Sequence, residues 1–229
     1  MIRAILFDFN GVIINDEPLQ MKAYTEIFNE EDVSMTEADY YGCMGMDDKT
    51  FIKTNFNRVG KEISDEKTSE ISARKTVAWR KMVEKEIPVF DGVKNFIKIV
   101  EKHFALAIVS MAKREEIEFA LEKIGVKDSF TAIISSENVS VCKPNPECYN
   151  AGFRLLDDAY TANGHHPLTR KECLVIEDAT QGIMAGNSAR MKTLGVTNTV
   201  SADELRAAGA TAVTKTLADW MPSSIQRVF

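Results

Sequence analysis

The chain has 229 residues, 45% of them hydrophobic and 27% charged, which is enough for one large core or for a core domain with an insertion. Its formal net charge of −6 argues against nucleic acid or an anionic membrane surface as a general partner, although a few local cations can still attract an anionic substrate. No segment approaches the roughly 18–20 uninterrupted apolar residues of a membrane span, and the N-terminal apolar run is too short for a signal peptide.

The cysteines favour a reducing compartment. No two of them form a C-x-x-C pair, and none belongs to a Cys/His cluster with the spacing of a zinc site. They are therefore interpreted as ordinary thiols: Cys43, Cys142, Cys148 and Cys173. We expect a soluble cytoplasmic protein that is a monomer and has neither nucleic acid nor a membrane as a partner.

The first predicted element is a buried strand over residues 2–7, an apolar run that stops at Asp8. Gly11 then permits a tight turn. Between about residues 18 and 86 helical spacing replaces strand spacing, charges are dense and β-branched runs are few. Apolar residues fall there on three helix faces: Leu19, Ala23, Ile27 and Phe28; Phe51, Ile52, Phe56 and Val59; Ile71, Val77, Met82 and Val83.

Strands and helices alternate in the rest of the chain. The predicted strands cover residues 105–109, 132–134, 173–176 and 193–196, and the predicted helices lie at 93–100, 117–124, 147–156 and 182–191. This alternation predicts an α/β fold with right-handed crossovers and a parallel, doubly wound sheet. We therefore predict a helical domain, residues 16–87, inserted into a core domain formed by residues 1–15 and 88–229.

Polar side chains follow several of the predicted strands. Asp8, Ser110 and the pair Glu177-Asp178 each come just after the carboxyl end of a strand, and Lys143 follows another strand after a loop. Ligands of open α/β sheets bind at this edge. One polar residue after a strand means little, but this set carries the chemistry of a single reaction.

Four short motifs together resemble those of the haloacid dehalogenase (HAD) superfamily, in their order and spacing. They are Asp8-Phe9-Asn10-Gly11-Val12, Val109-Ser110-Met111, Lys143-Pro144-Asn145-Pro146, and Ile176-Glu177-Asp178-Ala179 with Gly182. Within the superfamily the chain is similar to the group of β-phosphoglucomutases and small sugar-phosphate phosphatases. The resemblance runs from residue 4 to about residue 200, and the predicted helical insertion looks like the cap of that group.

This resemblance implies a phosphoryl-transfer site that uses Mg²⁺. Asp8 would be the nucleophile that attacks phosphorus and forms an acyl phosphate. Magnesium prefers hard oxygen ligands, which Asp8, Asp178 and Glu177 can supply, together with the backbone carbonyl of Asn10. Outside such a motif set, an aspartate or an acidic pair at these places would be interpreted as a helix cap.

The resemblance also implies a phosphate-binding role for Ser110, Met111 and Lys143. The Ser110 hydroxyl and nearby backbone amides would donate to the phosphoryl oxygens. Lys143 would supply a positive charge between the nucleophile and the phosphate. Taken singly, such a serine is usually a helix N-cap and such a lysine is usually a solvated surface charge. The phosphate-binding interpretation therefore depends on the four motifs together.

Candidate substrate contacts in the insertion are less specific. Gly42 and Gly45 resemble the glycines of the cap substrate loop, and Arg74 and Lys75 match a basic pair that contacts the site in related mutases. A solvent-facing charge on an amphipathic helix is an equal alternative for that pair. The loop around the two glycines lacks the arginine that binds a distal phosphate in the mutases, and Arg114 is a candidate substitute.

Asn10 departs from the family pattern, which has an aspartate acting as general acid and base at this position. An amide cannot transfer a proton at neutral pH, and general acid–base catalysis typically contributes about 10²–10⁴-fold. Three explanations remain open: a slow enzyme or another proton carrier such as Asp16 or Glu17, an engineered variant, or a protein that binds without turnover.

These observations support three functions. The leading prediction is a phosphatase acting on a small phosphorylated metabolite, such as a sugar phosphate, through phospho-Asp8. The second is a β-phosphoglucomutase-like phosphotransferase, favoured by Arg74 and Lys75 and opposed by Asn10 and the missing arginine. The third is a silent phosphometabolite-binding protein. Comparing Asn10→Asp with the chain itself would separate turnover from binding alone.

Overall fold

A parallel sheet forms the centre of the structure, a computed structural model that describes residues 1–229. Its order is β3–β2–β1–β4–β5–β6, and every neighbouring pair is parallel. The strands are β1 (Ala4–Phe7), β2 (Ala105–Val109), β3 (Ala132–Ile134), β4 (Cys173–Glu177), β5 (Lys192–Val196) and β6 (Ala212–Thr214). The predicted α/β fold with a doubly wound sheet is confirmed, with one additional edge strand, β6.

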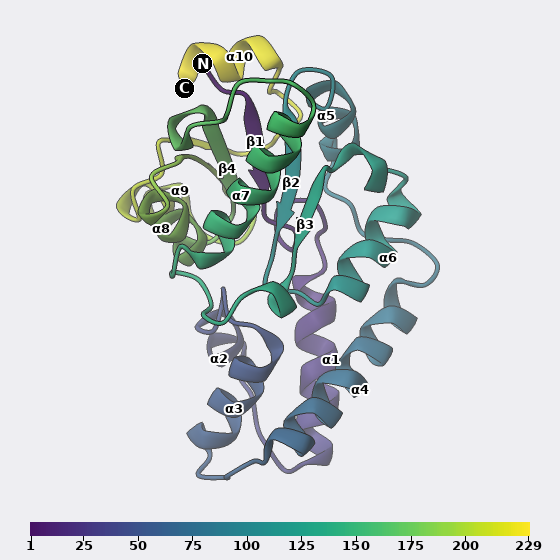
Figure 1. The fold of residues 1–229 in the computed structure, drawn as a ribbon. Helices are drawn as coiled ribbons and strands as arrows, with labels where there is room; N and C mark the ends of the chain where they lie inside the picture. Colours follow the sequence, from purple (N-terminus) through teal and green to yellow (C-terminus); the bar gives the residue numbers. More distant parts are fainter.

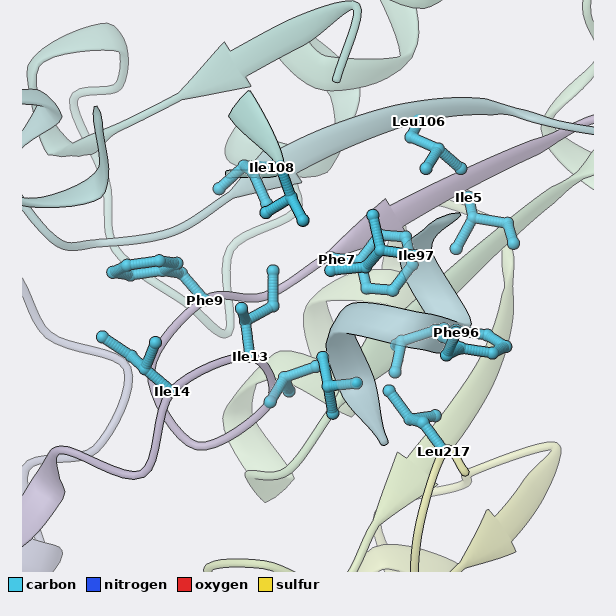
Figure 2. Packing of buried hydrophobic residues seen from close by; sticks show 14 of the residues in the cluster. Ile5, Phe7, Phe9, Ile13, Ile14, Phe96, Ile97, Leu106, Ile108 and Leu217 are labelled. Carbon is cyan, nitrogen blue, oxygen red and sulfur yellow. The ribbon is translucent and has the colours of Figure 1, made fainter. Parts of the chain in front are cut away.

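Both faces of the sheet are buried, as its all-parallel pairing requires. Successive residues of β1 alternate between the faces, so Ile5 and Phe7 join one cluster of apolar side chains while Ala4 and Leu6 join another. Figure 2 shows Ile5 and Phe7 packed near Phe96 of the helix that covers the first face. Burial of an apolar side chain of this size contributes roughly 1.5–3 kcal/mol. The first face is covered by α5 (Val93–Val100) and α6 (Arg114–Ile124), and the second by α7 (Glu147–Ala162) and α8 (Thr180–Ser188).

Four helices lie beyond the carboxyl ends of the strands (Figure 1). They are α1 (Glu17–Glu30), α2 (Glu37–Tyr41), α3 (Asp48–Arg58) and α4 (Asp65–Val83). They share an apolar cluster of their own, which includes Tyr24, Phe28 and Phe51. The sequence predicted three of these helices and missed α2, because five residues are too few to show a period. α2 instead begins with a capping box between Thr36 and Asp39.

The chain crosses between the helical insertion and the sheet domain at two adjacent segments. The Asn15 amide donates to the Pro88 carbonyl at 2.6 Å, and the Phe90 amide donates to the Ile13 carbonyl at 3.2 Å. The two crossings lie next to the predicted boundaries at residues 16 and 87. Backbone hydrogen bonds at this point hold the outgoing and returning segments side by side, which fixes where the insertion meets the sheet.

The last segments complete the core domain. They are α9 (Ala202–Ala207), β6 and α10 (Pro222–Val228), with single 3-10 turns earlier in the chain at Lys127–Ser129, Ser136–Asn138 and Arg170–Glu172. α8 ends earlier than predicted, because Arg190 adopts a positive φ of 61°. Ile2 and Gln226 exchange hydrogen bonds of 2.9 and 2.6 Å, so the two termini lie together (Figure 1). No helix combines the length and the hydropathy that a membrane-spanning segment requires.

Candidate active site

The strand order explains why the motif residues meet. β1 lies between β2 and β4, and the order of the strands reverses at this point, which is where open α/β sheets bind ligands. Asp8, Ser110 and Glu177 follow or end these three strands, and Lys143 arrives from the loop beyond β3. All four line one cavity of about 740 Å³, open mouth included, between the sheet edge and the helical insertion.

Three carboxylates gather beside this cavity, and two of them, Asp8 and Glu177, also line it. Oxygen atoms of Asp8, Glu177 and Asp178 all lie within 4.8 Å of one another. Thr199 donates its hydroxyl to Oδ2 of Asp178, whereas Oδ1 of the same carboxylate is buried without a hydrogen-bond partner. An orphaned buried carboxylate oxygen beside two further carboxylates is a set of hard donors. The residues present therefore fit a magnesium ion.

Lys143 is the only cation in contact with this cluster. Its Nζ lies 3.0 Å from Oδ1 of Asp8 and 2.5 Å from Oε1 of Glu177, and it donates to the Val109 carbonyl at 3.3 Å. The Tyr149 hydroxyl donates to the same Glu177 oxygen at 2.7 Å. Three carboxylates against one ammonium leave an excess of negative charge, which a divalent cation would balance.

The pKa values reflect this excess. Burial and, after it, the charge of Glu177 raise the pKa of Asp8 to about 7, against the opposing effect of the Lys143 ammonium. Burial, followed by the charges of Glu177 and Asp8, raises the pKa of Asp178 well above its ordinary value. Both carboxyl groups are thus destabilised as anions in the absence of a cation, and a bound cation would lower both pKa values.

Two glycines let the backbone approach the carboxylates. Gly11 has φ of +74°, and a Cβ there would overlap the carboxylate of Asp178. A Cβ at Gly182, in the first turn of α8, would overlap the carboxylate of Glu177. Both glycines belong to the motifs singled out in the sequence, and the structure gives each a steric reason.

The predicted phosphate-binding residues lie on the β2 side of the cavity. Ser110 and Met111 both line it. The Ser110 amide donates to Ile134 in the neighbouring strand, and its hydroxyl oxygen accepts a hydrogen bond from the Ala112 amide at 3.1 Å. The Met111 amide has no partner among the backbone groups of the chain. The Ser110 hydroxyl and the Met111 amide are therefore the donors that remain for an anion.

Asn10 lines the cavity but directs its amide nitrogen toward Asp16, where the chain enters the helical insertion. Its Nδ2 donates to both carboxylate oxygens of Asp16, at 2.9 and 3.1 Å. Asp16 is fully buried and also accepts from Gln20 at 3.0 Å and from the Trp79 indole at 2.8 Å. Asp16 does not line the cavity, whereas the next residue, Glu17, does.

The candidates from the insertion separate into two groups. Gly45 and Lys75 line the cavity, while Gly42 ends α2 away from it. Arg74 instead lies on the outer surface, 2.7 Å from Glu31, so the predicted pair does not act together. The reason is geometric, because consecutive residues of a helix point about 100° apart.

Arg114 is likewise not at the cavity. Its guanidinium donates to the Ile133 carbonyl at 2.7 Å and to Asn138 at 2.9 Å, which ties α6 to the end of β3. It is therefore not available to substitute for the arginine that the substrate loop lacks.

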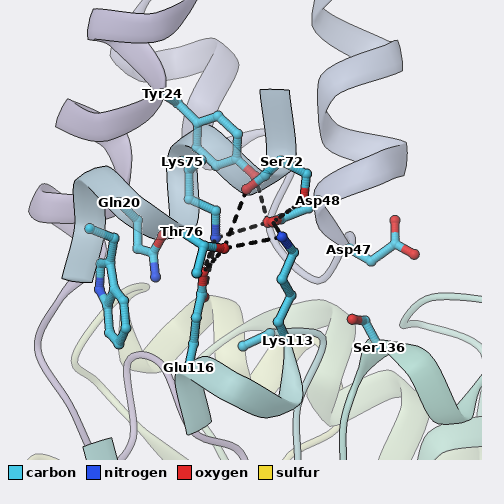
Figure 3. A network of polar contacts seen from close by, with 12 residues as sticks. Gln20, Tyr24, Asp47, Asp48, Ser72, Lys75, Thr76, Lys113, Glu116 and Ser136 are labelled. Carbon is cyan, nitrogen blue, oxygen red and sulfur yellow. Dashed lines mark hydrogen bonds and ion pairs between the residues drawn. The ribbon is translucent and has the colours of Figure 1, made fainter. Parts of the chain in front are cut away.

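A polar network around Lys75 joins the insertion to the core domain (Figure 3). Its Nζ lies 3.1 Å from Oδ1 of Asp48 and 3.0 Å from Oε1 of Glu116. The Tyr24 hydroxyl donates to Asp48 at 2.5 Å, and the Thr76 hydroxyl donates to Glu116 at 2.6 Å. Burial alone would lower the pKa of Lys75, but the two carboxylates raise it.

Sequence reasoning missed Asp48 and Glu116. Lys75 and Glu116 are 41 residues apart in the chain, and neither acid belongs to a motif. Burial alone would raise the pKa of Asp48, but Lys75 and the donors around it hold that pKa below its ordinary value. A glutamate on the buried face of α6 was the available signal, because a charged residue there needs a partner.

Known proteins resemble this chain over most of its length. Residues 5–196 match the family described as Haloacid dehalogenase-like hydrolase. The chain is 29% identical over 203 residues to the Putative phosphatase YhcW of Bacillus subtilis (strain 168), covering 88% of this chain and 86% of that one. It is 24% identical over 197 residues to Hexitol phosphatase B of Escherichia coli (strain K12), covering 85% and 83%.

Other matches differ in length or in kind. The chain is 26% identical to the Protein SUPPRESSOR OF QUENCHING 1, chloroplastic, of Arabidopsis thaliana, and the match covers 91% of this chain but 19% of that longer protein. The crystal structure of β-phosphoglucomutase (pgmB) from Clostridium difficile matches with a TM-score of 0.86 and 20% identity, over 100% of this chain and 97% of that one. At this identity the match shows that the two proteins share a fold. Since the family match spans all four motifs, the chain belongs to the haloacid dehalogenase-like hydrolase family.

Proposed function

We propose that this chain is a magnesium-dependent phosphatase that hydrolyses a small phosphorylated metabolite through a phosphorylated Asp8. The observation that carries the proposal is the position of Asp8 in the cavity, with the Lys143 ammonium 3.0 Å from its carboxylate and an acidic cluster beside it. A nucleophilic carboxylate, a fixed cation and a set of metal ligands are the parts that phosphoryl transfer needs. Membership of a hydrolase family supports the same reaction.

Each residue of the cavity floor would have a separate task. The Asp8 carboxylate attacks phosphorus, and the oxygen of the leaving group departs with the bonding electrons and takes up a proton. Water then hydrolyses the acyl phosphate and regenerates Asp8. Lys143 neutralises charge between Asp8 and the phosphoryl group, and the Ser110 hydroxyl and Met111 amide donate to phosphoryl oxygens.

Asp8, Glu177 and Asp178 would hold the magnesium ion, with the Asn10 carbonyl as a further oxygen ligand. When bound, the ion would supply charge neutralisation at the phosphoryl oxygens. The orphaned Oδ1 of Asp178 supports this assignment, since a buried carboxylate oxygen without a partner is costly unless a cation or donor meets it.

The lining of the cavity supports a substrate with one phosphate. Lys75 and Lys143 are the only cations among the lining residues, and carboxylates neutralise both of them. The wall contributed by the insertion carries the carboxylates of Glu17, Asp47 and Asp48 beside a set of apolar and aromatic side chains: Tyr24, Tyr40, Met44, Met46 and Phe51. A second phosphate would find no free cation there. The uncharged carbon skeleton of a monophosphate needs none and can contact the apolar and aromatic side chains. The name Hexitol phosphatase B, carried by one relative, is consistent with a sugar or polyol phosphate.

The test is phosphate release from a panel of sugar and polyol monophosphates, with and without magnesium. Asp8→Ala should abolish release. Asp203→Asn, at a side chain that is 95% exposed on α9, is the matched control and should release phosphate at the unchanged rate. Equal release by Asp8→Ala and the unaltered chain would refute the proposal, as would full activity in the presence of excess chelator.

A β-phosphoglucomutase-like phosphotransferase is the second candidate. The observation in its favour is Lys75, which lines the cavity as a basic residue of α4. Interconversion of glucose phosphates in the presence of a bisphosphate activator would establish it. Release of phosphate without interconversion would exclude it.

Asn10 motivates the third candidate, a protein that binds a phosphorylated metabolite without turnover. Binding of a monophosphate by calorimetry, with no phosphate released until Asn10 is changed to Asp, would support this candidate. Turnover by the unaltered chain would exclude it.

A further inference from the structure

Glu17 occupies the boundary between the phosphoryl site and the helical insertion. It is the first residue of α1, and its side chain lines the cavity together with Asp8 and Asn10. The residue is 9% exposed. The Tyr40 hydroxyl donates to its Oε2, while no side chain or backbone group of the protein donates to its Oε1. One carboxyl oxygen is thus held in place and the other remains free for a ligand.

The other two candidates for proton transfer are unsuited to it. Asn10 has only an amide, and its Nδ2 is engaged by Asp16. Asp16 is fully buried and receives hydrogen bonds from Asn10, Gln20 and Trp79, which occupy its two oxygens. Among the acids considered for this role, Glu17 alone combines access to the cavity with an oxygen that has no partner.

The charges around Glu17 favour its protonated form. Asp16 precedes it, Asp8 comes from the loop after β1, Tyr40 from α2 and Lys75 from α4. Burial, followed by the charge of Asp16, raises the pKa of Glu17 to about 8; the Tyr40 hydrogen bond and Lys75 oppose the rise. A carboxyl group that keeps its proton at neutral pH is in the state that a general acid requires.

We propose that Glu17 is the catalytic acid and base of this site, and that it moves the proton which Asn10 cannot. This inference rests on the proposed phosphatase function. It explains how a chain with an amide at position 10 can retain a complete reaction, because the carboxyl group is supplied from the first turn of α1 instead of from the loop after β1.

The proton balances in both steps. As Asp8 forms its bond to phosphorus, the bond to the leaving oxygen breaks, that oxygen keeps the electron pair, and the Glu17 carboxyl gives it a proton. In the second step the Glu17 carboxylate takes a proton from the water that attacks phosphorus. The acyl phosphate bond breaks, Asp8 regains its carboxylate, and inorganic phosphate leaves. The sum is phosphate ester plus water giving alcohol plus phosphate.

Leaving groups of different basicity test the assignment. The phosphorylation of Asp8 is measured in single-turnover experiments with magnesium, using an alkyl ester such as sorbitol 6-phosphate and the activated ester p-nitrophenyl phosphate. An alkoxide needs a proton to depart, whereas p-nitrophenolate does not. Glu17→Gln should reduce the rate of Asp8 phosphorylation about 10²–10⁴-fold with the alkyl ester. With the activated ester the reduction should be less than about tenfold.

Rescue separates catalysis from structure. Gln at position 17 has the same shape and can still accept from Tyr40, so Glu17→Gln should keep the thermal stability of the unaltered chain to within a few degrees. Adding Asn10→Asp to Glu17→Gln should restore phosphorylation by the alkyl ester. Equal losses with both esters, unchanged rates with the alkyl ester, or absence of rescue would each overturn the inference. Failure of the proposed function itself is distinguishable, because Asp8→Ala would then release phosphate as fast as the unaltered chain.

Discussion

The network around Lys75 predicts a large loss of stability when its cation is removed. The Lys75 side chain is 3% exposed, and that of its partner Glu116 is 1% exposed. Lys75→Met keeps most of the volume of the side chain, but it leaves the Glu116 carboxylate buried without a counter-charge and leaves Asp48 with only Lys113, whose Nζ is 3.9 Å away. Removing one partner of a buried ion pair costs about 3–5 kcal/mol. For a chain of this length that loss corresponds to a fall in the melting temperature of roughly 6–20 °C.

The assay is chemical denaturation followed by tryptophan fluorescence, because Trp79 on the same helix is fully buried and will report the loss of packing. The matched control is Lys67→Met, also on α4. Lys67 lies 2.9 Å from Glu31, but its side chain is 37% exposed, and solvent-exposed ion pairs contribute little to stability. Equal and small effects of the two substitutions would refute the account of the network.

The pH dependence gives a second check on the same variant. The pKa of Asp48 is lowered in the folded chain, so its contribution to stability is present above the pKa of the unfolded state and is lost as pH falls through the lower folded value. In Lys75→Met, protonation of the carboxylates that have lost their cation instead raises the stability of the folded chain. The difference in stability between the two proteins should therefore narrow as pH falls, and a difference that widens would contradict this sign.

Three further predictions concern the cavity itself. Gly182→Ala should lower phosphate release by about 100-fold, because the new Cβ displaces the carboxylate of Glu177; helix propensity alone would predict a more stable and equally active protein. Magnesium at 100 times its dissociation constant should stabilise the chain by about 2.7 kcal/mol and so raise its melting temperature. Asp178→Asn should be more stable than the unaltered chain without magnesium, and magnesium should raise its melting temperature only slightly. Met46→Lys should raise kcat/KM for a sugar bisphosphate relative to the matched monophosphate by about tenfold, since it places a free cation on the cavity wall; an unchanged ratio would contradict the proposed substrate preference.

The elements of the sheet domain were predictable because their signals are local. An apolar run that ends at Asp8 predicts a strand and its carboxyl end, and the same holds for the run that ends at Glu177 and Asp178. β6 was not predictable in this way. It is a three-residue edge strand of half-buried side chains, so neither length nor alternation marks it.

The cavity was predictable only in part, because side-chain direction and pairing depend on the tertiary structure. Lys75 and Arg74 are adjacent and have similar charge, yet one lines the cavity and the other pairs with acids on the outer surface. Arg114 was a reasonable candidate from its place after Ser110, but its carbonyl and amide acceptors come from β3 and from the turn after it. Such partners are separated by many residues, and no sequence period connects them.

The central claim is that the Asp8 carboxylate accepts the phosphoryl group. The most direct measurement is mass spectrometry of peptides from the chain, quenched in acid during turnover of a sugar monophosphate with magnesium. The account predicts a phosphoryl group on Asp8 that decays as phosphate is released, and none in Asp8→Asn or in excess chelator. Phosphate release with no label on Asp8, or with the label on another residue, would contradict it.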